Sequence, residues 1–205
     1  MRTGILGGTF DPPHLGHLVL GAAAWRALDL NRVLFVPAGE PWRKQREQSQ
    51  GEAISPAAAR LRMVEAATAA LPWAEVSTIE VDRAGPSYSL ETVQALAAGD
   101  SDGEHWWLVV GADALEDLPH WHEPVRLVAA ARFAVASRDG VLAGAPAELA
   151  GLVPDIAGRI DAVPMPDLSV ASTDLRDRVR GGRPTDVLLP QTVREVVDEL
   201  GLYRE

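Results

Sequence analysis

The chain has 205 residues, of which 47% are hydrophobic and 23% charged, a mixture typical of one globular domain. This composition excludes a disordered chain and a large multidomain assembly. Its 19 Lys and Arg against 29 Asp and Glu give a net charge of -10, which argues against broad electrostatic binding to nucleic acid or an anionic membrane. Cysteine is absent, so disulfides, thiolate metal ligands and a cysteine nucleophile are excluded. Since no apolar run approaches the roughly 18 residues that cross a bilayer, and no signal-peptide core is evident, we expect a cytoplasmic protein.

Short apolar runs alternate with longer amphipathic stretches, the order typical of βαβ units. We therefore predict an α/β fold, a doubly wound, Rossmann-like parallel sheet of about five strands. The predicted strands are Thr3–Gly7, Arg32–Val36, Glu75–Val81, Trp106–Val110 and Arg132–Ala136. The predicted helices between them are Leu15–Leu28, Pro56–Leu71 with Ser55 as its N-cap, Leu90–Ala98 and Pro124–Ala130.

The pattern changes near the C-terminus, where two helices are predicted over Ser172–Arg180 and Pro190–Leu200 without a strong strand between them. We expect one domain over residues 1–205, with residues 167–205 as its small helical C-terminal part. The segment Gly39–Ser55 is polar, aperiodic and long for an inner connection, so it is predicted to be a mobile functional loop.

The most informative segment is residues 4–17, which lead from the first predicted strand through a turn rich in Gly and Pro into the first predicted helix. Open α/β sheets bind their ligands at such a place. Gly7 and Gly8 lack a Cβ, so the backbone there can approach a ligand closely or take a positive φ. The helix start offers unpaired N–H groups and the positive end of a dipole, and both favour phosphate.

Two histidines, His14 and His17, are three residues apart, which puts both rings near that helix start. Gly16 between them leaves room for a bound group. Taken alone, such a pair is more often a set of surface or capping histidines, and no third ligand for zinc is evident. Neither GxxxxGK[ST] nor GxGxxG follows the strand, which argues against P-loop hydrolysis and dinucleotide-type hydride transfer.

The string GGTFDPPHLGH at residues 7–17 resembles the GGTFDPxHxGH signature of HxGH-motif nucleotidyltransferases, specifically that of the nicotinate-nucleotide adenylyltransferase family. VASTDLR at 170–176 is similar to the second signature, ISSTxIR, with Ala171 where the family has Ser. GPSYSLET at 85–92 resembles a PSYTxxT segment, with Ser89 where Thr is usual. Weaker matches, VP with PWRK at 36–44, GADAL at 111–115 and GLY at 201–203, extend the resemblance over nearly the whole chain.

The resemblance implies three groups of site residues and no protein metal site. The implied catalytic residues are His14, His17 and Arg176. The implied ATP-binding residues are Gly7, Gly8, Thr9, Phe10, His14, Gly16, His17, Gly111, Asp113, Ser172, Thr173 and Arg176. The implied acceptor-binding residues are Lys44, Ser87, Ser89 and Trp121.

The residues by themselves leave other roles open for several of these positions. Ser172 and Thr173 precede a helical pattern and can cap it, and Asp113 can cap the helix after its strand. Lys44 lies in a run of charges that is typical of a solvated surface. Trp121 lies in a polar loop, which favours a stacking role over a place in the core.

The family's reaction transfers the adenylyl group of ATP to nicotinate mononucleotide, a step of NAD biosynthesis that forms deamido-NAD and pyrophosphate, with Mg²⁺ carried on ATP. We expect this reaction here. Transfer to nicotinamide mononucleotide or phosphopantetheine, a cytidylyltransferase, and a nucleotide sensor without turnover stay open as alternatives. The expected partners are ATP and nicotinate mononucleotide, without nucleic acid or membrane, and a homo-oligomer is left open.

Overall fold

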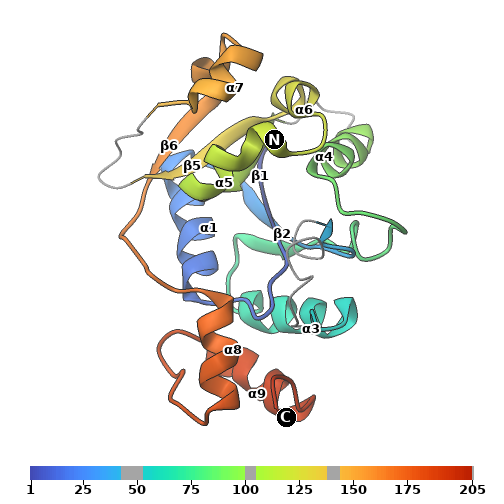
Figure 1. Cartoon of the computed structure of the whole chain (residues 1–205), viewed down its shortest axis with the longest axis vertical. Helices are drawn as coiled ribbons and strands as arrows, with labels where there is room; N and C mark the ends of the chain where they lie inside the picture. The colour runs from blue at the N-terminus through green and yellow to red at the C-terminus, as the bar shows by residue number, and fades with distance from the viewer. Residues whose placement is uncertain (43–52, 100–104, 138–143, 205) are drawn as a thin grey trace. The chain divides into compact units, whose positions relative to one another are not determined.

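The computed structural model describes residues 1–42, 53–99, 105–137 and 144–204, and it contains a six-stranded sheet (Figure 1). The strands lie in the order β3-β2-β1-β4-β5-β6, and β1 with β4, β4 with β5 and β5 with β6 pair in parallel. This is the strand order of Rossmann-type sheets, so the predicted doubly wound α/β fold is confirmed. The strands are β1 (Arg2–Gly8), β2 (Arg32–Pro37), β3 (Ala74–Val76), β4 (His105–Val110), β5 (Arg132–Ser137) and β6 (Ile160–Pro164).

Strands β1, β2, β4 and β5 coincide with the predicted apolar runs to within one residue at each end. Their inner residues are buried almost without interruption, rather than at alternate positions. This is the burial of central parallel strands that are covered on both faces. It explains why continuous apolar runs, not alternating ones, mark these strands in the sequence.

Strand β6 is the sixth strand and is not among the predicted ones. It contains Asp161 and ends on Pro164, and both residue types are disfavoured inside a strand. The Asp161 carboxylate accepts hydrogen bonds from the guanidinium of Arg132, at 2.8 Å to each oxygen, and from the indole N–H of Trp107 at 2.8 Å. Arg132 comes from the adjacent strand β5 and Trp107 from β4, the strand beyond it. These partners compensate for an aspartate that is disfavoured in a strand by local propensity.

The strand predicted over Glu75–Val81 is mostly wrong, because β3 ends at Val76. A turn follows, in which the N–H of Asp82 donates to the carbonyl of Thr78 at 2.8 Å. The Thr78 hydroxyl donates to the Asp82 carboxylate at 2.6 Å. Side-chain hydrogen bonds of this kind compete with a strand, and here they close the turn.

The predicted helices are confirmed, with ends that shift by up to three residues. Ser55 does not cap the second one, since Pro56 is at its N-cap and no side-chain cap bond forms. Two short helices, α5 and α7, are not among the predicted ones. None of the described helices has the length and hydrophobicity needed to cross a membrane. The helices are α1 (Leu15–Ala27), α3 (Ala57–Thr68), α4 (Ser89–Ala98), α5 (Ala112–Asp117), α6 (Pro124–Ala130), α7 (Ala147–Leu152), α8 (Ser172–Arg180) and α9 (Gln191–Glu199).

The chain forms two compact units. The first unit contains Met1–Gly7, Leu20–Leu34 and Tyr88–Asp167, and the second contains Gly8–Val19, Phe35–Ser87 and Leu168–Glu205. In the first unit, β1 and β4 are neighbours and the strand order reverses at β1, which is where sheets of this type bind ligands. The expectation that residues 1–205 form one domain stays a prediction.

In the second unit, α3, α8 and α9 surround one apolar cluster, and Figure 1 shows these helices grouped in cyan, orange and red. Met63 of α3, Leu175 of α8 and Val193 of α9 are fully buried in it. The C-terminal helices thus belong to the same unit as the segment Gly8–Val19, which contains the histidine pair.

Candidate active site

The turn after β1 is shaped by Phe10, which has a positive φ of 52° and a fully buried ring. Gly7 and Gly8 do not take a positive φ, so of their two predicted roles only close approach of the backbone to a ligand is left. A Cβ on Gly8 would lie 3.2 Å from the Phe10 ring, so this glycine makes room for Phe10 rather than for a ligand. A Cβ on Gly7 would meet nothing within 4 Å, so Gly7 alone keeps an open backbone surface at the end of β1.

The two histidines of the motif form one rigid pair. His14 is 7% exposed, and its ring centroid lies 3.8 Å from that of His17. The backbone N–H of His14 donates to Nδ1 of His17 at 3.1 Å. The neutral His17 ring therefore carries its proton on Nε2, where it is a hydrogen-bond donor. The Phe10 ring meets His17 edge-on, at 4.9 Å between centroids, and fixes the ring from another side.

Gly16 has a different role from the one predicted. A Cβ at Gly16 would lie 3.1 Å from Cε1 and Nδ1 of His14. The space beside Gly16 is thus occupied by the His14 ring and not left open for a bound group. The absence of a Cβ at Gly16 lets the buried imidazole pack directly on its backbone.

The start of α1 also differs from the expectation of unpaired N–H groups. The N–H of Leu15 donates to the Leu188 carbonyl at 2.9 Å. Those of His17 and Leu18 donate to the His14 carbonyl at 2.9 and 3.3 Å, and that of His14 donates to the His17 ring. Donors for a phosphate at this helix start must therefore come largely from side chains.

The second motif forms the start of α8. Ala171 is at the N-cap, where no side-chain cap bond forms, so the alternative in which Ser172 and Thr173 cap the helix is wrong. The hydroxyl of Ser172 instead donates to the carbonyl of Pro12 at 2.9 Å. Arg176, 9% exposed, donates from Nη1 to the carbonyl of Asp11 at 2.9 Å. The structure thus brings the two motifs into direct contact.

Asp11 and Tyr203 lie within matched sequence segments but were not among the predicted site residues, and the structure shows that they are in contact. Asp11 is 3% exposed and accepts the Tyr203 hydroxyl at 2.6 Å and the Ser55 N–H at 3.1 Å. Burial, and then the charge of Asp11, raise the pKa of Tyr203 well above its ordinary value, so its proton stays in that bond. A signal was present, because Asp11 lies in the first motif and Tyr203 in the GLY ending.

Arg60 of α3 is a second residue that the sequence does not single out. It is 1% exposed, and burial lowers its pKa although the charge of Asp11 opposes this shift. Its guanidinium donates to the carbonyls of Thr9 at 2.9 Å and Gly39 at 3.0 Å. It also donates to the carbonyls of Ala38 and Ser55, so it joins the ends of β1 and β2 to the start of α3. In the sequence it is one arginine in an amphipathic helix, and nothing there marks it as buried.

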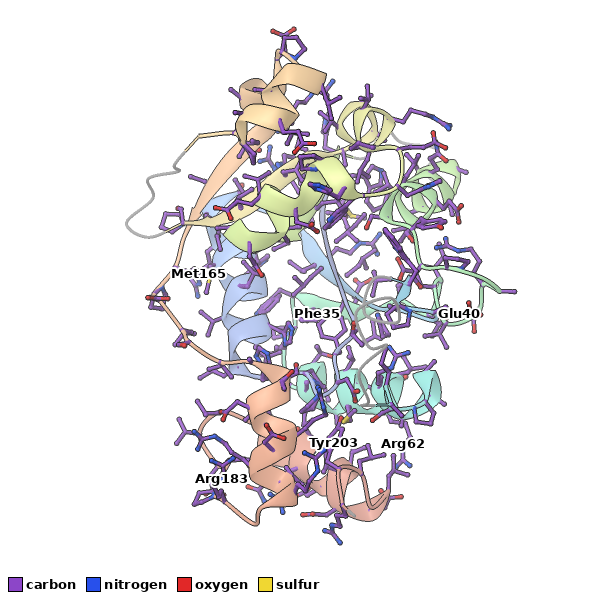
Figure 2. The ribbon with its side chains drawn as sticks, viewed as in Figure 1. Phe35, Glu40, Arg62, Met165, Arg183 and Tyr203 are labelled. Atoms are coloured by element: carbon purple, nitrogen blue, oxygen red, sulfur yellow. The ribbon has the colours of Figure 1, made fainter. Side chains whose placement is uncertain are left out.

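The predicted acceptor residue Ser87 lies in the second unit. The hydroxyl of Ser87 accepts the N–H of Glu40 at 3.3 Å, and the Ser87 N–H donates to the Glu40 carbonyl at 2.9 Å. These bonds hold the segment after β2 against the one before α4; Figure 2 labels Glu40 there. Lys44, and most of the predicted loop Gly39–Ser55, lie outside the described residues.

The other predicted residues lie in the first unit. Asp113 is exposed in the first turn of α5, and its carboxylate would lie 2.4 Å from a Cβ on Gly111, so a side chain at Gly111 would require this carboxylate to turn aside. Gly111, not Asp113, is at the N-cap of that helix, and no side-chain cap bond forms. Ser89 begins α4. The indole N–H of Trp121 donates to the Asp117 carboxylate at 3.1 Å, which fixes the direction of its ring.

Tyr88 and His122, the neighbours of Ser89 and Trp121, stack at 4.0 Å between ring centroids with an interplanar angle of 17°. This contact joins the start of α4 to the segment before α6. The segments that contain the predicted acceptor residues Ser89 and Trp121 are therefore in contact within the first unit through Tyr88 and His122.

Comparisons with known proteins agree with this geometry. A model of the cytidylyltransferase-like family matches residues 5–178. A protein of Roseiflexus sp. named "Probable nicotinate-nucleotide adenylyltransferase" is 45% identical over 98% of this chain and 97% of its own length. One of the same name from Thermomicrobium roseum is 40% identical over 99% of this chain and 92% of its own. The solved structure of Plasmodium falciparum nicotinic acid mononucleotide adenylyltransferase complexed with NaAD has a TM-score of 0.71, 16% identity, and covers 98% of this chain and 97% of that one.

The chain therefore belongs to the cytidylyltransferase-like family, whose model covers both of its motifs. Its relatives narrow this membership to the nicotinate-nucleotide adenylyltransferases, the family that its motifs resemble. The expected class of enzyme is thus confirmed, and the solved structure supports the fold.

Proposed function

We propose that this chain transfers the adenylyl group of MgATP to nicotinate mononucleotide, releasing pyrophosphate and forming deamido-NAD. The observation that carries the proposal is the histidine pair, whose His17 ring is held by Phe10 and by the backbone N–H of His14, which donates to its Nδ1. The acceptor is inferred from the names of the relatives that match the chain along its length.

The reaction needs no general base from the protein. The phosphate of the acceptor has a second pKa of about 6, so it is an anionic nucleophile at neutral pH. One of its oxygens forms a bond to the α-phosphorus of ATP, and the bond from that phosphorus to the oxygen shared with the β-phosphate breaks. Catalysis must then come from aligning the two substrates and from donors that stabilise the developing charge.

The proposed donors are His14, His17 and Arg176, with Lys44 from the segment outside the described residues. In this proposal Nε2 of His17 donates to the phosphate under attack. Arg176 lies in the same unit, and its contact with Asp11 holds it beside the motif. Mg²⁺ would arrive as part of the substrate, bound by the phosphates of ATP. Nowhere in residues 1–42, 53–99, 105–137 and 144–204 do three His, Asp or Glu side chains meet as a metal site would require.

Trp121 and Ser89 are the proposed acceptor contacts, the first stacking on the pyridine ring and the second donating its hydroxyl to the carboxylate. Of the cations near in sequence, Arg126 forms an ion pair with Glu123, so its charge is already partnered. Backbone N–H groups and the Ser89 hydroxyl would then receive the nicotinate carboxylate. An amide would bring its own NH₂ toward these donors, which leaves donors facing donors in a desolvated pocket.

One assay tests the proposal and its alternatives together. Pyrophosphate release is measured with ATP, Mg²⁺ and nicotinate mononucleotide, nicotinamide mononucleotide or phosphopantetheine in turn, with the variant His17→Ala as control. Release with nicotinate mononucleotide that the variant loses supports the proposal. Release with another acceptor alone would move the chain to a different member of the superfamily, and ATP binding without release would indicate a sensor. Location in the cytoplasm and any homo-oligomer stay predictions from the sequence.

A further inference from the structure

Three segments that are distant in sequence, Ser55, α8 and Tyr203, converge on the dipeptide Asp11-Pro12, which lies between the end of β1 and the histidine pair. All of them belong to the second unit. Two of the bonds reach the Asp11 carboxylate, one its carbonyl and one the carbonyl of Pro12. The donors are the N–H of Ser55, the hydroxyls of Ser172 and Tyr203, and the guanidinium of Arg176.

The bond from Tyr203 is the shortest of these four. At 2.6 Å it is a short hydrogen bond from a hydroxyl to a buried carboxylate. Figure 2 shows Tyr203 next to α3, where it packs on the apolar cluster and contacts the sulfur of Met63 at 3.8 Å. Removal of the hydroxyl would leave one oxygen of a carboxylate that is 3% exposed without this partner.

The Asp11 carboxylate is linked to the histidines through a stiff connection. Pro12 and Pro13 are both buried, and each has its φ fixed by its ring. Only these two prolines separate Asp11 from His14, whose ring packs on Gly16 and stacks on His17. A displacement of Asp11 would therefore also displace the rings of His14 and His17.

We propose that Tyr203 is a positioning residue for the histidine pair: its hydroxyl holds the Asp11 carboxylate, and through Pro12 and Pro13 this sets the place of His14 and His17. The inference rests on the proposed function for its catalytic readout. The end of the chain thus acts on the first motif, near the other end of the sequence. Tyr203 itself touches no substrate in this proposal.

The test is the variant Tyr203→Phe, which keeps the ring in the apolar cluster and removes only the hydroxyl. We expect kcat to fall about tenfold, with KM for both substrates changed less than about twofold, because a misplaced donor weakens the transition state more than substrate binding. Backbone amides of residues 9–18 should exchange hydrogen about tenfold faster in the substrate-free variant, since the segment opens more readily.

Val196→Ala is the matched control, because it removes packing from the same cluster through α9 and leaves the bond to Asp11 intact. This control shows how a loss of stability by itself affects kcat and hydrogen exchange. Val196→Ala should keep the wild-type kcat and the wild-type hydrogen exchange at residues 9–18. In the Asp11→Ala background, Tyr203→Phe should lower kcat less than about twofold further, since the residue it acts through is gone. If the double variant does not fold, the comparison of Tyr203→Phe with Val196→Ala still tests whether Tyr203 positions the histidine pair.

A wild-type kcat for Tyr203→Phe, or equal losses in Tyr203→Phe and Val196→Ala, would overturn the positioning role. An equal loss of kcat in the presence and absence of the Asp11 carboxylate would overturn action through Asp11. If the unmodified chain transfers no adenylyl group, the proposed function fails, and the exchange of residues 9–18 still tells whether Tyr203 holds the segment.

Discussion

Gly16→Ala is the sharpest test of how the histidine pair is held. The added Cβ would lie 3.1 Å from Cε1 and Nδ1 of His14, closer than ordinary van der Waals contact. The His14 ring cannot turn aside freely, because it is buried and stacked on His17 at 3.8 Å. It must shift by a few tenths of an ångström, and the shift presses on His17.

The change in the free energy of unfolding is the sum of two opposing contributions, overpacking against His14 and the higher helix propensity of alanine. Overpacking of this kind costs about 1–3 kcal/mol, while replacing glycine within a helix stabilises by up to about 1 kcal/mol. The free energy of unfolding should therefore fall by at most about 3 kcal/mol, which leaves the enzyme folded. A misplacement of about 1 Å can cost about a hundredfold in rate, so a few tenths of an ångström should lower kcat about fivefold to tenfold.

The assay combines pyrophosphate release at saturating substrates with thermal unfolding. Gly151→Ala is the matched control, since Gly151 lies in α7 and a Cβ there would meet nothing within 4 Å. This control should gain up to about 1 kcal/mol of stability and keep its full kcat. An unchanged kcat in Gly16→Ala, or a loss of similar size in Gly151→Ala, would show that the packing of His14 on Gly16 does not govern turnover.

Three other outcomes are expected. His17→Ala should lose about 2–4 kcal/mol of transition-state stabilisation in kcat/KM while its thermal unfolding stays cooperative, and near wild-type turnover in the folded variant would remove His17 from the mechanism. Ala171→Ser should stabilise the chain by about 1 kcal/mol in denaturant unfolding, because Ala171 is at the N-cap of α8 with extended backbone angles that suit a capping hydroxyl; no gain would mean that the cap does not form. Burial alone would raise the pKa of Asp161, but the hydrogen bonds and charge of Arg132 and the hydrogen bond from the Trp107 N–H lower it below its ordinary value of 3.8. The ionised carboxylate therefore stabilises the folded chain at pH values above 3.8. This stabilisation is lost as the pH falls through the pKa that Asp161 has in the folded chain. Asp161→Asn should therefore be less stable than the unmodified chain at pH 7 and lose less stability between pH 5 and pH 2, and parallel acid unfolding curves would contradict this.

Substrate selection gives a fifth prediction. Nicotinate mononucleotide should exceed nicotinamide mononucleotide in kcat/KM by about a hundredfold, or roughly 2.7 kcal/mol, because of the donor mismatch described above. Ser89 lacks the methyl group of the usual Thr, which favours a smaller preference for the acid than in relatives with Thr, without a change of its sign. Equal efficiency with both acceptors would refute selection for the acid while leaving adenylyl transfer intact.

Local sequence patterns were sufficient to predict the elements that do not depend on a particular distant partner. The continuous apolar runs of β1, β2, β4 and β5 predicted central strands, because such strands are buried on both faces whatever their partners. The first motif likewise predicted a histidine pair at a helix start, since residues three apart meet on one turn.

Tertiary structure alone decided the features whose partners are far away along the chain. Strand β6 depends on Arg132 and Trp107 to satisfy Asp161, and Arg60 is buried only because carbonyls of three other segments surround it. The bond between Asp11 and Tyr203 joins residues 192 positions apart. No local propensity encodes such a contact, because a carboxylate or a guanidinium is driven out of the core unless the fold delivers its partner to the same place.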